Sequence, residues 1–514
     1  MTPEKRVWVA SLLSVLLLLV YAQFLSRYSA TSPPTEQPTN AQQLAPSQPQ
    51  ASLVPLLKAD EETIALESSA LRLEVGKTTA AIHALVLKGF QNIAGESLLR
   101  VSTGSGALMA GFGDEPGSWV LEEQRARRAV WRWRDQDGLT EAFVLELDEA
   151  LPRFTATLNV TNRAATAHSV PVRIVATWSR ADTMGGQYNL LEAVFRTEQA
   201  RPWQKTHLRY PAGAREARHV PRRTSMATLS ERFFCQALRL DHDNDSQVSM
   251  LPAERGAIAA QIASSLTAAP NATTSYSVAV YVGPRDFFRL RDAGFEQAFP
   301  LGFLTRIGLI LLLLLNGIAS GVRNYGLAIV ILSALVTAAL SPFTLLSFRS
   351  MKKLQELQPK MDQVKRKHAK DAKRMNQEIL ALFREHRVSP LSGCLPILLQ
   401  MPVFFALWAA ISHAIELRGQ PFLWISDLSL PDRLARLPFG FDLNILPILM
   451  AGAMFVQTKL SQPKVAQSGT NPFSGPLMSV VFGVMFYQVP SGLVLYWLTN
   501  SLSAVLLYKL AKRS

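Results

Sequence analysis

Long apolar runs lie near both ends of the chain, and short alternating patterns fill the middle. Residues 7–25 form a nineteen-residue apolar run behind Lys5 and Arg6. As a helix this run matches a hydrocarbon core of ~30 Å. A cleaved signal peptide is the alternative, but the run is long for the apolar part of such a peptide. The pattern favours an uncleaved membrane anchor with a cytoplasmic N-terminus, because the two cations precede the run.

Two different patterns follow the anchor: a polar, almost uncharged segment, and then a long region in which apolar and polar positions alternate. Residues 29–52 are rich in Pro, Gln, Ser and Thr and almost uncharged, which predicts an extended tether. From residue 53 to 295, apolar and polar positions alternate in short stretches with turn signals such as Asp137-Gly138 between them. Clear stretches are 71–75, 129–134, 143–147 and 154–160. The alternation predicts one exported β-sandwich domain.

The last third of the chain carries further spans. Clear apolar runs are 326–346, 391–411, 443–460 and 477–508. The last run has thirty-two residues, about 48 Å of helix, which is too long for one upright span. Pro490-Ser491-Gly492 divides it into two. With the N-terminal anchor, these runs predict six spans, five of them forming a helical membrane bundle.

The charge distribution decides how residues 301–322 are interpreted, although they are apolar enough to span. The 514 residues hold 53 Lys and Arg against 39 Asp and Glu, a net charge of +14. Residues 347–390 hold twelve basic and five acidic residues (+7), and residues 201–232 hold eight and two (+6). If 301–322 crossed the membrane, the +7 segment would lie outside, against the positive-inside rule. We therefore predict an interfacial helix there, with both termini in the cytoplasm.

Composition excludes several function classes. A basic chain can bind nucleic acid, but 18% charged residues and a mean hydropathy of +0.12 indicate a membrane protein instead. Cys235 and Cys394, the two cysteines, are too few for a cysteine-based metal cluster. Residues 326–346 carry no ionisable side chain, which weakens a proton-coupled transporter. We expect no cofactor, no metal and no enzymatic activity.

The +7 segment has the pattern of a helical hairpin. Apolar seams at 3-4 spacing run from Leu354 to His368 and from Ala372 to His386, and Pro359 is expected to kink the first helix. One interpretation is a solvated hairpin whose positive charge has no role beyond the positive-inside rule. The functional one is a cytoplasmic docking arm for ribosomes, a targeting receptor or lipid headgroups, without sequence-specific nucleic-acid binding. Its candidate contacts are Lys352, Lys353, Lys365, Arg366, Lys367, Lys370, Lys373 and Arg374.

Polar side chains recur at helical spacing within the predicted spans. Ser333, Thr337, Ser341 and Thr344 lie on the 326–346 span, and Tyr496, Thr499, Asn500 and Ser503 on the last. Gln400 lies within the 391–411 span. Such groups commonly form hydrogen bonds between neighbouring helices, and the alternative is that they line a shared polar cavity.

Several motifs together give the chain a resemblance to the YidC-type membrane protein insertases, in their Gram-negative form. These motifs are Leu357-Gln358-Pro359-Lys360, Asn376-Gln377-Glu378, Ser389-Pro390-Leu391-Ser392-Gly393-Cys394, Leu399-Gln400-Met401-Pro402-Val403-Phe404, Leu446-Pro447-Ile448-Leu449-Met450 and Pro490-Ser491-Gly492-Leu493-Val494-Leu495-Tyr496-Trp497. The resemblance implies an inner-membrane protein with a periplasmic β-supersandwich domain and a five-helix bundle. It also implies a hydrophilic groove for the polar tails of nascent membrane proteins. The Sec translocon, ribosomes and membrane lipids are the implied partners.

The resemblance also implies the site residues and one departure from the family. Members usually carry an Arg five residues before a Pro in the second span, and here Thr337 stands at that distance from Pro342. The groove is therefore expected to be hydroxylic rather than cationic. Its candidate residues are Ser333, Thr337, Gln400, Met401, Tyr496, Trp497 and Thr499. Two rival functions remain: a transporter or lipid flippase with a sugar-binding β-domain, and a structural factor for the translocon that lacks a groove.

The expected organisation has thirteen segments. They are the anchor 1–28, tether 29–52, periplasmic β-domain 53–295, interfacial region 296–325, second span 326–346, cytoplasmic hairpin 347–390, third span 391–412, periplasmic loop 413–442, fourth span 443–460, cytoplasmic loop 461–476, fifth span 477–489, sixth span 490–508 and cytoplasmic tail 509–514.

Overall fold

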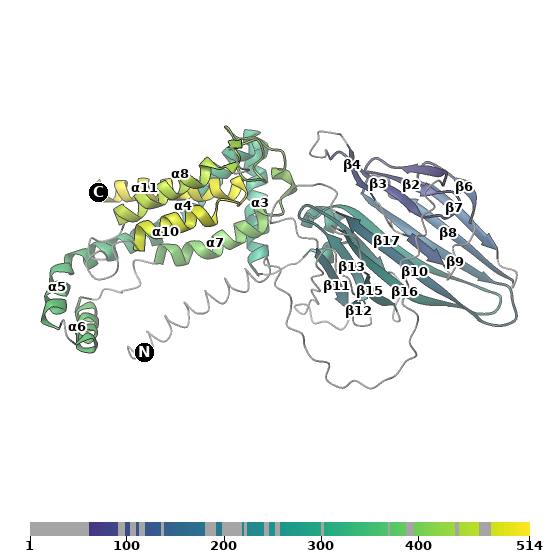
Figure 1. Cartoon of the computed structure of the whole chain (residues 1–514), viewed down its shortest axis with the longest axis horizontal. Helices are drawn as coiled ribbons and strands as arrows, with labels where there is room; N and C mark the ends of the chain where they lie inside the picture. The colour runs from purple at the N-terminus through teal and green to yellow at the C-terminus, as the bar shows by residue number, and fades with distance from the viewer. Residues whose placement is uncertain are drawn as a thin grey trace. The chain divides into compact units, whose positions relative to one another are not determined.

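The computed structural model of the chain has two compact units, divided between Ala298 and Phe299 (Figure 1). The structure describes residues 61–90, 98–102, 109–112, 119–134, 138–179, 192–197, 218–219, 224–240, 246–251, 257–299, 303–368, 371–386, 395–436, 442–461 and 474–513. The predicted anchor, the tether, Lys370, Cys394 and most of the basic stretch 201–232 lie outside these residues.

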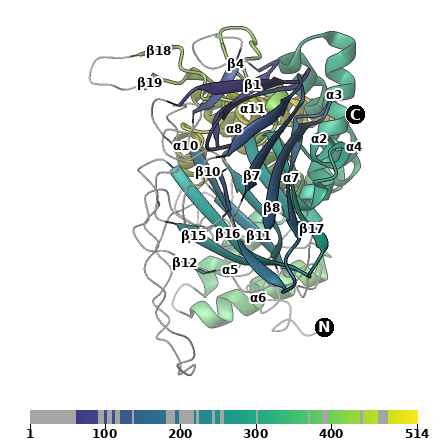
Figure 2. The ribbon, with the colours of Figure 1, turned by 90° about the vertical axis from the view of Figure 1, so that its right-hand side faces the viewer.

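Antiparallel strands in three sheets make up the described part of the first unit. The four-stranded sheet has the order β1-β2-β3-β4, the five-stranded sheet β12-β15-β16-β10-β5, and the eight-stranded sheet β11-β13-β14-β17-β9-β8-β7-β6. Figure 2 shows the long strands β8, β10, β16 and β17 running lengthwise through the unit. The bounds are β1 Thr63–Glu67, β2 Leu71–Gly76, β3 Ile82–Lys88, β4 Leu98–Ser102, β5 Met109–Phe112, β6 Val120–Gln124, β7 Arg128–Arg134, β8 Leu139–Leu147, β9 Arg153–Asn162, β10 His168–Ser179, β11 Glu192–Thr197, β12 Arg218–His219, β13 Thr224–Ser230, β14 Phe234–Leu240, β15 Gln247–Leu251, β16 Ala257–Ala268 and β17 Ala272–Pro284.

The alternating pattern predicted these strands correctly where it was clearest. Stretches 71–75, 129–134, 143–147 and 154–160 lie in β2, β7, β8 and β9. In β9 every second side chain is buried, because one face of the sheet covers the core and the other does not. Gly138, at the start of β8, has a φ of +81°, which suits the tight turn predicted there. The β-sandwich prediction is confirmed.

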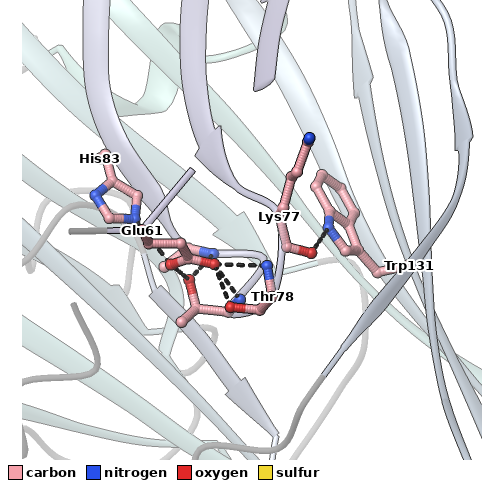
Figure 3. Close-up of polar contacts among 7 residues, drawn as sticks. Glu61, Lys77, Thr78, His83 and Trp131 are labelled. Carbon is pink, nitrogen blue, oxygen red and sulfur yellow. Dashed lines mark hydrogen bonds and ion pairs between the residues drawn. The ribbon is translucent and has the colours of Figure 1, made fainter. Parts of the chain in front are cut away.

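A network around Glu61 ties the four-stranded sheet to the eight-stranded one (Figure 3). The Glu61 carboxylate accepts hydrogen bonds from the backbone amides and hydroxyls of Thr78 and Thr79, at 2.5 to 2.7 Å. These residues follow β2, and the carbonyl of their neighbour Lys77 accepts a bond from Trp131 Nε1 on β7 at 3.1 Å. Burial raises the pKa of Glu61, but the hydrogen bonds outweigh burial and lower it to about 2.

The first unit ends with two short helices, α2 (Phe287–Asp292) and η1 (Glu296–Ala298). Asp286 caps α2 by accepting from Arg289 N at 2.9 Å. Phe295 packs on Tyr281 of β17 with 5.8 Å between ring centroids. This packing extends the β-domain to Ala298, three residues beyond the predicted boundary at 295.

The second unit is a helical bundle. In Figure 1 its helices α4, α7, α8, α10 and α11 run alongside one another, whereas α3 runs across them and contacts α7 and α4. A Cβ at Gly308 of α3 would overlap the backbone of Ala406 in α7, so the two helices meet closely there. The bounds are α3 Phe303–Val322, α4 Tyr325–Glu356, α5 Gln358–Lys367, α6 Ala372–Glu385, α7 Leu395–Ile411, η3 Ile415–Leu417, β18 Ala435–Arg436, β19 Asp442–Leu443, α8 Ile445–Ser461, α10 Ser474–Met485 and α11 Ser491–Arg513.

Three stretches of described helix have the length and hydropathy of a membrane span: Phe303–Val322, Tyr325–Leu346 and Ser491–Leu510. The first of them is α3, which we expected at the interface, so length alone does not separate the two interpretations. Its crosswise direction in Figure 1 fits an interfacial helix. The six-span topology stays a prediction, since the apolar stretches of α7 and α8 are shorter.

The disruption predicted at Pro359 is a break between two helices rather than a kink within one. Helix α4 continues past the expected span end at 346 to Glu356, and a new helix, α5, begins at Gln358 with the proline in its first turn. A proline is tolerated in this position because amides of the first turn have no intrahelical acceptor. The divide at Pro490 is confirmed, because α10 ends at Met485 and α11 begins at Ser491.

Candidate functional site

A buried polar contact joins three helices of the bundle at Tyr496. Tyr496 of α11 and Ser333 of α4 are both fully buried. Ser333 Oγ donates to the backbone carbonyl of Tyr496 at 3.2 Å, and the Gln400 side-chain amide of α7 donates to the Tyr496 hydroxyl. The structure thus brings together three of the predicted groove residues. The Tyr496 ring is enclosed by the bundle.

The other hydroxyls of the stripe bond to their own helix. Thr337 Oγ1 donates to the carbonyl of Ser333 at 2.8 Å, and Thr499 Oγ1 to that of Leu495 at 2.9 Å. Ser341 and Thr344 form the same kind of bond. A hydroxyl bonded in this way has used its proton and keeps lone pairs that can accept. Thr337 is 8% exposed, and Thr499 is half-buried.

Trp497, the residue after Tyr496, lies in a cluster of aromatic rings. The Trp497 ring meets Phe404 of α7 edge-on, with 4.7 Å between centroids. It also contacts Phe482 of α10 and Phe486, which directly follows that helix, at 5.7 and 5.5 Å between centroids. Met401, half-buried, precedes Phe404 by one helical turn. This aromatic cluster packs α7, α10 and α11 together, so Trp497 has a structural role whatever else it contacts.

A hydrogen-bonded loop, described at residues 412–436 and 442–444, covers one end of the bundle. Ser491 N and Gly492 N, at the start of α11, donate to the carbonyls of Leu430 and Leu428 at 2.7 and 2.9 Å. Ser491 Oγ donates to Asp427 O at 3.1 Å. These bonds satisfy amides that the first turn of α11 leaves without intrahelical partners.

The same loop also holds the start of α8. The buried carboxylate of Asp432 accepts from Leu446 N at 2.8 Å, and Asn444 Nδ2 donates to the carbonyl of Tyr487 at 2.6 Å. Sequence reasoning missed this closure. The sequence offered no local signal for it, because Asp432 lies fourteen residues before Leu446 and Tyr487 lies 43 residues after Asn444.

The predicted hairpin exists at the far end of α4. Helices α5 and α6 pack through Met361 and Phe383, flanked by Ile379 and Leu382, and Figures 1 and 2 both show the two helices together. His368 and His386, predicted to lie in the apolar seams, instead make polar contacts. His368 Nε2 lies 2.9 Å from Glu378 Oε1, and His386 Nε2 lies 3.1 Å from Lys360 Nζ. An imidazole at the end of a seam can reach a charged side chain on the facing helix.

Most of the predicted hairpin cations point to solvent. Lys365 is half-buried, with its amine 4.0 Å from Asp362, and Lys367 lies 3.8 Å from Glu378. The exposed members are Lys352, Lys353, Arg366, Lys367, Lys373 and Arg374. Within the described residues, no group of three or more His, Cys, Asp or Glu side chains is placed to hold a metal ion.

Two family models match the chain in adjoining stretches. The model described as "YidC periplasmic domain" matches residues 64–314, and the one described as "60Kd inner membrane protein" matches residues 317–513. The boundary between them falls within α3, close to the division between the two structural units.

Two curated relatives share one name. The "Membrane protein insertase YidC" of Pelobacter propionicus is 37% identical over 286 residues, 54% of this chain and 52% of the relative. The same-named protein of Syntrophobacter fumaroxidans is 39% identical over 244 residues, 46% of this chain and 43% of the relative. The match thus spans about half the length of these relatives.

Solved structures also match. A structure described as "Active YidC insertase crystal structure with the first transmembrane domain resolved" aligns with 88% of this chain and 92% of its own, with a TM-score of 0.39 and 18% identity. A galactose mutarotase-like protein from Lactobacillus casei aligns with 43% of this chain and all of its own, with a TM-score of 0.32 and 10% identity.

Proposed function

Because the chain belongs to the family of YidC membrane protein insertases, we propose that it inserts nascent proteins into the inner membrane of a bacterium. Insertion moves a polypeptide from water into lipid and involves no enzymatic reaction. The proposal places the β-unit in the periplasm and the hairpin in the cytoplasm, with six spans and both termini cytoplasmic.

The observation that carries this proposal is the buried polar contact of Ser333, Gln400 and Tyr496 between three helices of the bundle. A charged side chain at the centre of a bilayer costs ~2.5–3.5 kcal/mol on insertion scales. A polar groove along α4, α7 and α11 lowers that cost for the tail of a substrate, while the apolar segment of the substrate partitions into lipid. Insertion then needs no nucleotide.

The direction of the hydroxyl bonds indicates which tails the groove suits. Thr337 and Thr499 donate to carbonyls of their own helices, so the groove offers them mainly as acceptors. Between Tyr325 and Leu346, α4 carries no charged side chain. We therefore propose that hydration of the groove by its hydroxyl groups stabilises the polar tails of substrates in this protein. Attraction of acidic residues by a positive charge is not needed.

The two ends of α4 support a groove with one open end. The hydrogen-bonded loop lies at its start, where Phe422 packs against Gly326, and the hairpin follows its end. The helix has 32 residues, so about 48 Å separate the ends. The hydrogen-bonded loop closes the periplasmic end in this proposal, and the exposed cations of the hairpin meet ribosomes or lipid headgroups. Cooperation with the Sec translocon is part of the same proposal.

Complementation of a strain that lacks its own insertase tests the function. In a strain whose own insertase is depleted, this chain should restore inner-membrane insertion, measured by quantitative proteomics of the membrane fraction. Thr337→Leu should restore it poorly for substrates with polar tails. If the chain restores growth but membrane protein content stays unchanged, the transporter or flippase function would be favoured. Full complementation by Thr337→Leu would remove position 337 from the groove.

A further inference from the structure

An exposed apolar turn projects from the loop at one end of the bundle. Phe422 and Ile425 exchange two backbone hydrogen bonds of 2.8 Å, which leaves Leu423 and Trp424 at the tip. Leu423 is 75% exposed and Trp424 39%. Leu423 also has a φ of +53°, a conformation that a bulky side chain rarely adopts. In water, the exposed Leu423 side chain contributes no burial energy to offset this strained backbone conformation. An apolar environment would bury the side chain and offset the strain.

The turn is firmly held at its base. Phe422 packs against Gly326, and a Cβ at that glycine would overlap the phenyl ring. Trp424 Nε1 donates to Asp432 Oδ2 at 3.3 Å. The same oxygen accepts from Leu446 N in the first turn of α8, and Asp432 is only 3% exposed. The tip is therefore fixed relative to the first turns of both α4 and α8.

The surroundings of the turn identify what covers it. The next residue of α4, Leu327, is 41% exposed, and Ile448 and Leu449 at the start of α8 are 55% and 45% exposed. These are the first lipid-facing side chains of helices that the proposed function places in the membrane. The turn is continuous with that surface, and tryptophan is enriched at the boundary between lipid and water.

We propose that the Leu423–Trp424 turn inserts into the headgroup region of the bilayer and fixes the depth of the bundle at its loop-covered end. The inference rests on the proposed function only in taking α4 and α8 as membrane helices. The occupant is the lipid surface itself. The fixed tip transmits its position to both helices through Gly326 and Asp432.

Spin-label accessibility tests this inference in the full chain, reconstituted in vesicles of phosphatidylethanolamine and phosphatidylglycerol. Cys394→Ser removes one native thiol, and Cys235 is left in place because it is fully buried and burial raises its pKa to about 12. A nitroxide is then attached through Leu423→Cys or through two comparison variants. Ser426→Cys is the matched control, exposed and polar in the same loop, and Leu335→Cys marks the lipid-facing side of α4, where the side chain is 56% exposed.

The expected result is that the ratio of collisions with lipid-soluble oxygen to collisions with a water-soluble nickel chelate at 423 lies between the high ratio at 335 and the low ratio at 426. Equal nickel access at 423 and 426, with 335 in lipid, would overturn the inference and leave the proposed function intact. Nickel access at 335 as well would contradict both. Protection of 423 from both reagents would mean that protein covers the turn, which also overturns the inference.

Discussion

The hydroxyl of Ser333 on α4 lies 3.2 Å from the backbone carbonyl of Tyr496 on α11 and donates a hydrogen bond to it. Both residues are fully buried. The bond ties the predicted second span to the predicted last one at the point where Gln400 also contacts Tyr496. The polar stripe of the sequence is thus a link between helices at Ser333, and any groove must be formed beside this link.

Removal of this link should weaken the bundle measurably. Ser333→Ala leaves the Tyr496 carbonyl without this donor and is expected to cost about 1 kcal/mol. Ser333→Leu should cost about 1–3 kcal/mol more, since the site has no room for a larger side chain. Thermal unfolding in detergent measures both. Ser320→Ala is the control, because the exposed Ser320 bonds only within α3. An unchanged midpoint for Ser333→Leu would contradict the packing described here.

Position 337 should govern the handling of polar tails. Thr337→Leu removes a hydroxyl from the groove, and the loss of a polar partner costs roughly 1–3 kcal/mol, so insertion of polar-tailed substrates should fall roughly tenfold. Thr337→Ser should stay near wild type, since it keeps the hydroxyl. Pulse labelling with protease accessibility of the substrate measures insertion. An equal loss for Leu335→Ala, on the lipid-facing side, would show that the effect is not specific to the groove.

Glu61 should make the β-unit sensitive to acid. Its folded pKa of about 2 lies below the ordinary value of 4.5, so the ionised form stabilises the fold at neutral pH. This contribution is lost as the pH falls from about 4.5 to about 2. Glu61→Gln should cost up to about 3 kcal/mol at neutral pH, with no difference from wild type below about pH 2. Urea unfolding at several pH values provides the test.

Glu62→Gln is the neighbouring control for that experiment. The Glu62 side chain is 75% exposed and pairs with Lys77 at 2.6 Å. An exposed pair of this kind contributes roughly 0–1 kcal/mol. If both variants lost the same stability, the hydrogen bonds from Thr78 and Thr79 would have no special role.

The exposed cations of the hairpin should act through charge. Each cation near an anionic surface contributes about 1 kcal/mol, so changing Lys352, Lys353, Lys373 and Arg374 together to Gln should lower ribosome affinity at least roughly tenfold. The salt dependence of binding should become shallower. Sedimentation with ribosomes at several salt concentrations measures both. Exchanging Lys for Arg and Arg for Lys at the same positions keeps the charge and should keep the affinity; a similar loss there would point to shape instead.

The sequence predicted those parts of the fold where one periodicity dominates. Strands β2, β7, β8 and β9 follow from alternation, because one face of each is buried. Helices α5 and α6 follow from their apolar seams, and the break at Pro490 from backbone chemistry. At Pro359 the place of the disruption was predictable but its form was not, because a proline can start a helix as readily as bend one, and periodicity does not separate the two.

The sequence predicted which residues belong to the candidate site but not which hydrogen bonds they form. Spacing placed Ser333 and Thr337 on one face of a helix, but not the partner of each hydroxyl. Ser333 reaches across to Tyr496, whereas Thr337 turns back to its own helix, and this depends on which helix lies opposite. The closure by Asp432 and Asn444 involves loop residues that meet helix ends distant in sequence, which no local pattern specifies.

Photocrosslinking from position 337 tests the central proposal most directly. A photoreactive amino acid replaces Thr337 in one variant and the lipid-facing Leu335 in another, and each is mixed with ribosomes stalled on a membrane protein with a polar tail. If the groove lies along α4, the tail should crosslink to position 337, and position 335 should crosslink only to the apolar segment or to lipid. Tail crosslinks of equal yield at both positions, or at neither, would contradict a substrate groove along α4.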